Sequence, residues 1–411
     1  MRAGLSQARA SGPSAFWRRL LRPLLQSGCP TPFYLFSVCP IQDALVELDD
    51  TFGGLLFRHW LSCKTHPLPA LLKWWRAQNR GIEVVSEFEL RLARHLGFTP
   101  RQILINGPAK HHWLPAHPIP GLQVNFDSAA EVRVLAPLAR RLNWTCGIRL
   151  HTRQEFDPEA PQFPTQFGFT PAEAKPAITR LRQHGVRLET VHFHLRTNVA
   201  SPAIYERTLS EAAEGCRAAG FSPRYVDCGG GFPPPAVKSR SGRPLDAEFS
   251  LASMAKVYQR TKRFFPGLEE FWLENGRWLS ARSGVLVVSV LDTKDRPAMR
   301  NLICDGGRTL HALVSTWETH GLFSIPDRGG PLCLTTLNGP TCMSFDQLAR
   351  GQFPCALRPG DRLVWMDAGA YHLPWETRFS HPLAPIYWHD GRKVTAVRAP
   401  QSFKDWKASL G

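Results

Sequence analysis

Strand-like and helix-like segments alternate eight times within residues 51–284, and this alternation limits the possible folds more than any other feature of the sequence. Apolar segments typical of buried strands occur at 55–63, 82–86, 102–106, 122–126, 146–150, 188–194, 224–228 and 271–274. The segments between them have apolar residues at helical spacing, as after Pro67. Eight such units predict a parallel (β/α)8 barrel, whose chemistry lies at the carboxyl ends of the strands.

One predicted helix of this series contains a proline. The segment "SAAEVRVLAPLARRL" (128–142) has helical spacing but includes Pro137. Because proline removes a main-chain donor and clashes with the preceding turn, we expect Pro137 to disturb this helix.

The pattern changes after the predicted barrel, which spans residues 51–284. Residues 285–411 contain short strand-like segments separated by Gly, Pro and Asp turns, which predicts a second, mostly β domain. The strand-like "TPFYLFSV" lies in residues 31–50, which we expect to join that domain. Residues 1–30 form a basic extension with five arginines and no acid, in which the amphipathic 15–25 predicts a helix packed on the body rather than a targeting peptide.

Composition narrows the possible partners. The net charge of +16 is compatible with nucleic acid, an acidic membrane surface, anionic small ligands or a generic basic surface. The basic residues are dispersed without zinc-finger spacing, which favours anionic ligands over nucleic acid. No apolar run approaches the ~18 residues of a membrane helix. Ten cysteines without a CxxC pair or an export signal predict reduced thiols and a cytoplasmic location.

The predicted strand ends carry an unusual set of chemical groups. Lys64 follows the first strand, "DCGGGFP" (227–233) ends the seventh, and Glu274 ends the eighth. A glycine triplet can bind phosphate through main-chain N–H groups, and barrels often bind phosphate after strands seven and eight. An amine, a phosphate cradle, an acid and the flat ring of His194 together describe a site for pyridoxal phosphate (PLP).

Each of these residues also has a simpler explanation when taken alone. His194 is typical of a hydrogen-bonded core histidine, and Glu274 with Arg277 is typical of an ion pair. His192 and His194 have the spacing of metal ligands, but a clear third ligand is missing, so we predict no metal. Only the combination favours PLP.

Nine segments, in family order, resemble the fold-type III PLP-dependent decarboxylases, which include the ornithine, arginine and diaminopimelate decarboxylases. They are "TPFYLF", "SCKTHP", "GIEVVSEFEL", "ILINGPAK", "HFHL", "VDCGGGFP", "ENGRWLSARSGVL", "NGPTCMSFDQLA" and "MDAGAY". The resemblance runs from about Pro32 to Trp388. It implies a PLP-binding (β/α)8 barrel and a second, mostly β domain, as in alanine racemase.

The same resemblance implies roles for individual residues. Lys64 would be the Schiff-base lysine, Glu274 would hold the pyridine nitrogen, and His194 would stack on the ring. The phosphate would be bound by Gly229, Gly230, Gly231 and Arg277, with Thr197 and Tyr371 nearby. Cys342 would reach the active site of a neighbouring subunit and return a proton to Cα, which implies a homodimer with shared sites.

Three departures from the family pattern bear on the substrate. Glu83 stands where the family has Asp, and Arg196 stands where it has Gly. Met343 stands where the diamino-acid decarboxylases carry an acid for the distal ammonium, and a buried ammonium without a partner is costly.

These departures favour an anionic substrate. The segments "PTQFGF", "DGGRTLHAL" and "FSHPLAPIYW" are similar to a branch that decarboxylates citryl–amino-acid conjugates in carboxylate siderophore biosynthesis. A citryl group needs cationic partners. The candidates are Arg149, Arg196, Lys110, His111 and His112, with Met343 beside them in place of the acid.

Three other functions remain open. The first is decarboxylation of a free amino acid such as diaminopimelate or ornithine. The second is racemisation on the same fold, against which the segment around Cys342 argues. The third is a non-catalytic regulator that binds a partner, against which the retention of Lys64, His194, Glu274 and Cys342 argues.

Overall fold

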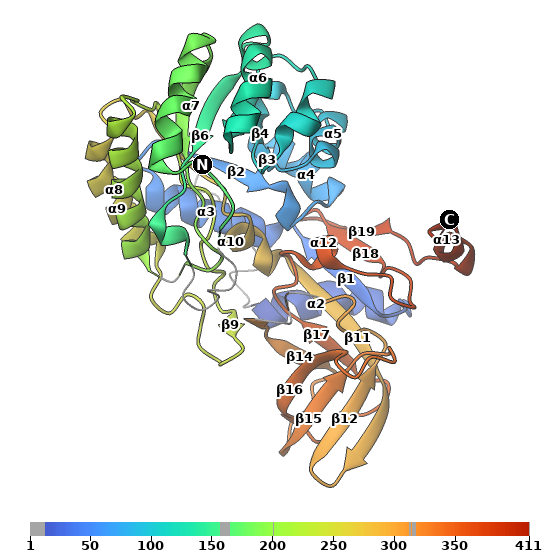
Figure 1. Cartoon of the computed structure of the whole chain (residues 1–411). Coiled ribbons are helices and arrows are strands. Elements are labelled where there is room, and N and C mark those ends of the chain that lie inside the picture. The colour runs from blue at the N-terminus through green and yellow to red at the C-terminus, as the bar shows by residue number, and fades with distance from the viewer. Residues whose placement is uncertain (1–12, 157–164, 200, 312–313, 315–317, 411) are drawn as a thin grey trace. The chain divides into compact units, whose positions relative to one another are not determined.

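The computed structural model describes residues 13–156, 165–199, 201–311, 314 and 318–410 (Figure 1). The chain divides into two compact units. The barrel unit comprises Glu47–Pro233 and Asp246–Trp278. The β unit takes its described residues from Met1–Val46, Pro234–Leu245 and Leu279–Gly411.

Eight strands form the closed barrel, in the order β10-β2-β3-β4-β5-β6-β7-β8. Every neighbouring pair is parallel, so the predicted fold is confirmed. The strands are β2 (Phe57–Ser62), β3 (Gly81–Val84), β4 (Ile103–Ile105), β5 (Gln123–Phe126), β6 (Thr145–Arg149), β7 (Arg187–His192), β8 (Tyr225–Asp227) and β10 (Glu270–Leu273).

Helices follow seven of the eight barrel strands in the described part of the chain. They are α4 (Pro69–Ala77), α5 (Glu87–His95), α6 (Ala129–Arg141), α7 (Pro171–Gln183), α8 (Pro202–Ala218), α9 (Leu251–Thr261) and the short α10 (Gly276–Ser280). The helix expected after β4 is replaced by two 3₁₀ turns, Lys110–His112 and Leu114–Ala116. Four prolines between residues 108 and 120 explain the difference, since proline cannot continue a regular helix.

The expected disturbance at Pro137 is wrong, because α6 continues through it to Arg141. Ser128 caps the helix by accepting a hydrogen bond from the Glu131 main-chain N–H. The apolar face of α6, including Val132 and Leu135, is buried. Helix packing therefore compensates for the one main-chain bond that proline removes.

The barrel interior is filled by large side chains from strands that are not all neighbours. Trp60 of β2, Leu104 of β4 and Trp272 of β10 form one fully buried cluster. Gly81 leaves room for it, since a Cβ there would lie 2.3 Å from the Trp60 ring. The barrel is therefore a packed core, with its chemistry at the strand ends.

The β unit is built on a sheet with the order β16-β15-β12-β11-β1-β18-β19, and β17 pairs with both β11 and β14. Near the start of the chain, β1 (Phe33–Ser37) pairs antiparallel with β11 and parallel with β18. The other strands are β9 (Lys238–Ser239), β11 (Gly284–Arg296), β12 (Met299–Cys304), β13 (Glu318–Thr319), β14 (Leu322–Ile325), β15 (Leu332–Asn338), β16 (Gln347–Pro354), β17 (Arg362–Trp365), β18 (Ile386–His389) and β19 (Val394–Arg398).

Four helices complete the described chain. They are α2 (Pro13–Gln26), α3 (Cys39–Phe52), α12 (His372–Trp375) and α13 (Phe403–Ala408). Within α2, Phe16, Trp17 and Leu21 are buried, and Arg18 donates to the Ser324 main-chain oxygen at 3.0 Å. The basic segment therefore packs as a helix on the β unit, while residues 1–12 lie outside the described part of the chain.

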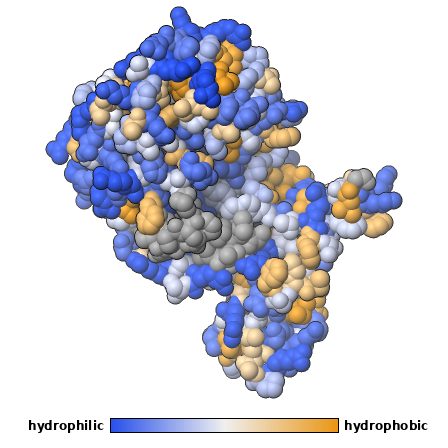
Figure 2. Space-filling model, in the orientation of Figure 1, coloured by the Kyte–Doolittle hydropathy of each residue, from blue (hydrophilic) through white to orange (hydrophobic). Residues whose placement is uncertain are grey.

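The barrel surface visible in Figure 2 is covered mainly by hydrophilic side chains, with apolar residues in small separate patches. Among the described residues, the helices are too short or too polar to cross a membrane.

Candidate active site

A cavity of about 650 Å³ opens at the carboxyl ends of the barrel strands. Its walls come from the ends of β2, β3, β4, β6, β7 and β10 and from the segment after β6. They comprise Lys64, Glu83, Val85, Asn106, Gly107, Pro108, Arg149, Glu155, Thr165, Gln166, Phe167, His192, His194, Leu195, Arg196 and Glu274. Five of the residues predicted from the sequence, Lys64, Arg149, His194, Arg196 and Glu274, thus line one cavity.

Lys64 enters this cavity from a 3₁₀ turn, Cys63–Thr65, that directly follows β2. Cys63 and Thr65 are buried and fix the turn, while the Lys64 side chain remains 34% exposed. Its Nζ lies 2.7 Å from Glu83 Oε2. The other oxygen of Glu83, Oε1, is buried without a hydrogen-bond partner among the described residues. Glu83 therefore holds the Lys64 amine through Oε2, and its Oε1 can accept a hydrogen bond from another donor.

Glu274 is the buried acid of the cavity, and two residues hold it. Asn106 Nδ2 donates to Oε1, and Ser62 Oγ donates to the Glu274 main-chain oxygen at 3.1 Å. His194 Nδ1 lies 3.8 Å from Oε2. Burial raises the pKa of a carboxyl, but interactions with His194, His192 and Lys64 bring the pKa of Glu274 below its ordinary value. Glu274 is therefore an anion at neutral pH.

Asp227 is a second buried acid, joined to Glu274 through amide side chains. Asn125 Nδ2 donates at 2.9 Å to both Asp227 Oδ2 and Asn106 Oδ1, and Asn106 in turn donates to Glu274. Burial and the negative charge of Glu274 raise the pKa of Asp227 well above its ordinary value. The pKa values of the two acids are therefore shifted in opposite directions, which favours the anion at Glu274 over the anion at Asp227.

The glycine triplet after β8 leaves no room for side chains. Gly229 and Gly231 have φ angles of +61° and +107°, which favour glycine. A Cβ on Gly230 would lie 2.8 Å from the Glu274 main-chain oxygen. Tyr205 Oη holds the loop by donating to the Gly230 oxygen at 2.8 Å. The N–H groups of Gly229 and Gly230 donate to Asp227 Oδ1 at 3.1 Å and to His194 Nδ1 at 3.2 Å, so a phosphate bound by this loop would replace these acceptors.

His192 and His194 differ in their surroundings. His192 is buried, and burial lowers its pKa well below the ordinary value, so its ring is neutral. His194 is partly exposed to the cavity, and its Nδ1 accepts from the Gly230 N–H at 3.2 Å. Together with Glu274 they place three possible metal ligands within 4.8 Å, so the third ligand that the sequence did not reveal is Glu274.

The two arginines of the cavity are held differently. Arg149 is buried between two acids, 3.9 Å from Asp127 Oδ1 and 3.6 Å from Glu155 Oε2, and its guanidinium lies over the Phe167 ring. Arg196 is partly exposed, and its Nη1 donates to the Phe156 main-chain oxygen at 3.1 Å. Arg149 is therefore paired with two acids of the protein, and Arg196 is a second cation in the cavity wall.

Eight candidate residues of the barrel unit lie outside the cavity walls: Lys110, His111, His112, Thr197, Gly229, Gly230, Gly231 and Arg277. Lys110 is fully buried, with its Nζ 2.8 Å from Glu131 Oε2, and burial lowers its pKa. We therefore remove Lys110 from the substrate site, because its charge is already compensated inside the protein. His111 packs against His112, and Thr197 is exposed outside the cavity walls.

Among these residues, Arg277 lies nearest in the sequence to the acid Glu274. It is buried in α10, directly after β10. Gly276 precedes it, where a Cβ would lie 2.3 Å from Thr65 Oγ1, next to the Lys64 turn. The predicted phosphate ligand and the predicted Schiff-base lysine therefore share one closely packed corner of the barrel.

The remaining predicted residues, Tyr371, Cys342 and Met343, belong to the β unit. Tyr371 has a φ of +65° and stacks on Trp375. Cys342 is exposed in the turn between β15 and β16, and Met343 beside it is partly buried.

The turn that carries Cys342 is organised around a buried carboxylate. Asp346 Oδ2 accepts from Thr341 Oγ1 at 2.6 Å and from its main-chain N–H at 3.1 Å. Asp346 Oδ1 accepts from the Arg308 N–H at 2.6 Å. The carboxylate fixes the main chain while leaving Cys342 exposed, as a residue that acts outside its own unit requires.

Sequence reasoning gave no role to the amide and acid network behind Glu274. Asp227 stands two residues before the glycine triplet, and Asn125 is a buried polar residue within β5. A buried polar residue in a barrel strand is costly without partners, so Asn125 was the available signal.

Glu89 should make the stability of the protein fall as pH rises. Burial and the nearby charge of Glu83 raise the pKa of Glu89 to about 7, although its Oε2 accepts from the Val85 N–H. A carboxyl whose folded pKa is raised disfavours folding once it ionises, so stability is lost between the unfolded value and about pH 7. We expect Glu89→Gln to raise the thermal unfolding midpoint more at pH 8 than at pH 5. An equal change at both pH values would contradict this assignment.

Comparison with known proteins gives a consistent result. Residues 48–281 match the pyridoxal binding domain of the pyridoxal-dependent decarboxylases. Diaminopimelate decarboxylase of Zymomonas mobilis is 24% identical over 356 residues, covering 83% of each chain. L-glutamyl-[BtrI acyl-carrier protein] decarboxylase of Niallia circulans is 27% identical over 365 residues, covering 84% of each. Diaminopimelate decarboxylase of Helicobacter pylori, solved with L-lysine, has the same fold, with a TM-score of 0.80, 22% identity and coverage of 95% and 99%.

Proposed function

Because the chain belongs to the pyridoxal-dependent decarboxylase family, we propose that it decarboxylates an amino acid whose far end carries carboxylates, most specifically a citryl conjugate. The family fixes the class of reaction and the cofactor, pyridoxal phosphate. The substrate class is the part that we infer from the residues of this chain.

The residues of the cavity fit pyridoxal phosphate. Lys64 offers an amine held by Glu83, whose second oxygen is buried without a partner. The loop Gly229–Gly231 would offer its main-chain N–H groups to the phosphate in exchange for Asp227 Oδ1 and His194 Nδ1, which accept from Gly229 and Gly230 here. Glu274 supplies a buried negative charge. When bound, pyridoxal phosphate supplies an electron sink for the electrons left on Cα after the carboxylate departs.

The protein's own groups then have distinct tasks. Lys64 holds the cofactor covalently, and Glu83 orients the amine through the 2.7 Å contact. Glu274, whose pKa lies below its ordinary value, would keep a proton on the pyridine nitrogen of the cofactor. His194, which lies beside the glycine loop, would stack on the cofactor ring. Cys342 of a second subunit supplies the proton to Cα.

The position of Arg196 in the cavity wall is the observation that carries the substrate class. A guanidinium there is suited to a distal carboxylate, and Met343 takes the place of the acid that would accept a distal ammonium. One relative is named for an L-glutamyl group on an acyl-carrier protein, which supports conjugated amino acids as substrates in this family. Release of carbon dioxide from a citryl conjugate would place the enzyme in carboxylate siderophore biosynthesis.

Diaminopimelate is the second candidate, and the names of the relatives favour it over the citryl conjugates. Its distal end has both a carboxylate and an ammonium, so Arg196 suits it as well. The distal ammonium of diaminopimelate distinguishes the two candidates, because Met343 has no negative charge to pair with it. Ornithine and lysine, which have no distal carboxylate, fit neither Arg196 nor Met343.

Carbon dioxide release from a matched panel tests the proposal. We expect citryl–L-amino acids to exceed ornithine and lysine in kcat/KM by roughly two to three decades, since an uncompensated buried charge costs about 3–5 kcal/mol. Diaminopimelate should fall between them. Equal turnover of diaminopimelate and the citryl conjugates would favour the second candidate, and faster turnover of ornithine would contradict both.

Arg196→Ala should weaken anionic substrates selectively and leave the absorbance of the bound cofactor unchanged. The matched control is Arg153→Ala, since that side chain is 83% exposed and pairs with Glu211 on the outside. An unchanged rate with the anionic substrate in Arg196→Ala would remove the basis of the substrate assignment.

A further inference from the structure

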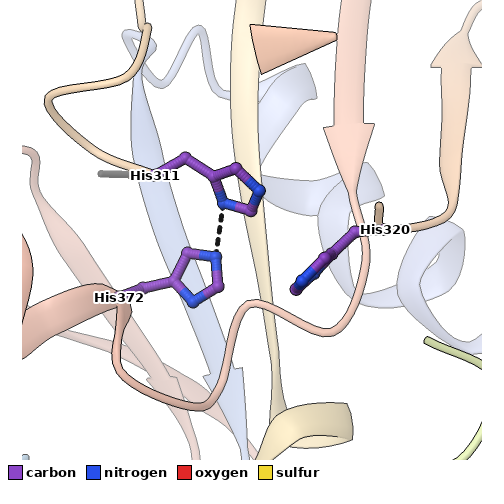
Figure 3. A group of neighbouring side chains, drawn as sticks. All are labelled: His311, His320 and His372. Carbon is purple, nitrogen blue, oxygen red and sulfur yellow. Dashed lines mark hydrogen bonds between the residues drawn. The ribbon is translucent and has the colours of Figure 1, made fainter. Parts of the chain in front are cut away.

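Three histidines that have no part in the proposed reaction converge inside the β unit. His311, His320 and His372 are 1%, 7% and 2% exposed, and one ligand nitrogen from each lies within 4.8 Å of the others. Figure 3 shows the rings of His311 and His372 facing one another, with the edge of His320 directed at the same space. The rings meet at 45° to 84°, so they converge by their edges and do not stack.

Hydrogen bonds to the main chain orient two of these rings. His372 Nδ1 lies 3.0 Å from the Ala370 oxygen, and His320 Nδ1 lies 3.0 Å from the Met366 oxygen. A carbonyl oxygen can only accept, so each Nδ1 carries the hydrogen and each Nε2 is turned inward. Histidines that bind metals show this arrangement, because the outer N–H is held by a carbonyl or carboxylate.

A carboxylate lies beside one of the three rings. Glu318 is 5% exposed and places Oε2 at 3.1 Å from His320 Nε2, but it is not part of the group whose ligand atoms lie within 4.8 Å of one another. It lies in β13, two residues before His320 and seven after His311. Three converging imidazoles are ligands that zinc prefers, and Glu318 is placed to hold His320.

We propose that His311, His320 and His372 bind a divalent transition metal of the zinc class, with Glu318 beside His320. All four side chains are buried, which suits a structural ion better than one that binds substrate. With Zn–N distances of about 2.0–2.1 Å, tetrahedral ligand atoms lie roughly 3.4 Å apart. His311 Nδ1 and His372 Nε2, now 2.5 Å apart, must separate by less than the width of an atom to admit the ion.

Such an ion would join three separate segments of the β unit. His311 follows β12, Glu318 and His320 lie in β13 and directly after it, and His372 opens α12 after β17. The residue before His372 is Tyr371, which the family pattern assigns to the phosphate. The metal would therefore fix the loop that presents Tyr371.

The competing explanation needs no ion. In it, Glu318 and His320 form an ion pair, and His311 and His372 form a hydrogen bond.

Metal analysis of the purified holoenzyme separates the two explanations. After reconstitution with Zn²⁺ and gel filtration, we expect one zinc ion per chain in the wild type, and a strong chelator should lower its thermal midpoint. Co²⁺ in place of Zn²⁺ should give the ligand-field absorption of a tetrahedral site, a measurement that needs no variant. His311→Gln and His372→Gln should each lose the metal and the chelator sensitivity.

Two controls locate the metal. His389→Gln removes another buried histidine of the β unit, which bonds to Ser37 Oγ, and should retain the zinc. His194→Gln disrupts the second His and Glu group, in the barrel, and should also retain it. A wild type that binds no zinc or cobalt after reconstitution would overturn the proposal. The proposal would also be overturned if His311→Gln and His372→Gln both retained the metal, or if His194→Gln alone lost it.

Discussion

Replacing Lys64 by alanine is expected to reduce kcat/KM for decarboxylation by at least about 10³-fold, because the covalent attachment of the cofactor is lost with the amine. Lys64 supplies the one lysine amine among the described residues that line the cavity, and Glu83 holds it at 2.7 Å. The wild type should be yellow, and borohydride should fix the cofactor to a single peptide that contains Lys64.

The control for this experiment is Lys73→Ala, because Lys73 is exposed on α4, nine residues further along the chain. It should retain the colour, the labelled peptide and the activity. Recovery of the cofactor on a peptide without Lys64 would show that the strand-end assignment is wrong. Lys110 is the nearest alternative amine, but its ion pair with Glu131 encloses it.

Mixing two inactive variants, Lys64→Ala and Cys342→Ala, is expected to restore activity. If each site combines Lys64 of one subunit with Cys342 of the other, a mixed dimer contains one site with both native residues. Random exchange in a two-fold symmetric dimer should therefore restore about a quarter of the wild-type sites. The exposure of Cys342 on a turn fixed by Asp346 is the structural reason to expect this arrangement.

The matched control mixes Lys64→Ala with Glu274→Gln. Both substitutions lie in the barrel unit, so no mixed dimer can contain a site in which both residues are native. Subunit exchange should be verified by co-purification of a tagged and an untagged chain. Recovery in the control, or none in the test mixture after verified exchange, would exclude a site shared in this way.

The barrel was predictable because its signal is repeated. Each strand is a short apolar run buried on both sides, and each is followed by a segment with a different period, so an error in one segment leaves the order intact. The exceptions are local. The segment after β4 contains four prolines and forms only 3₁₀ turns, while Pro137 is tolerated because the face of α6 is buried.

Site residues could be predicted from the sequence when they directly follow a barrel strand, because that position brings them to the site. Lys64, His194 and Glu274 line one cavity because parallel strands end at the same rim of a barrel. Sequence could not show that Lys110 is neutralised by Glu131, since that pairing depends on how α6 begins. Nor could it show that the pKa values of Asp227 and Glu274 shift in opposite directions, which depends on their burial and their surroundings.

The pairing of β1 has a consequence for the order in which the protein matures. Its partners β11 and β18 are synthesised about 250 and 350 residues later, after all eight barrel strands. During synthesis, the apolar strand Phe33–Ser37, buried at every position in the native sheet, has no partner to cover it. A chain truncated before β18 would leave one edge of β1 open to other strands. Nascent and truncated chains should therefore depend on chaperones and aggregate through this segment, even where the barrel has already closed.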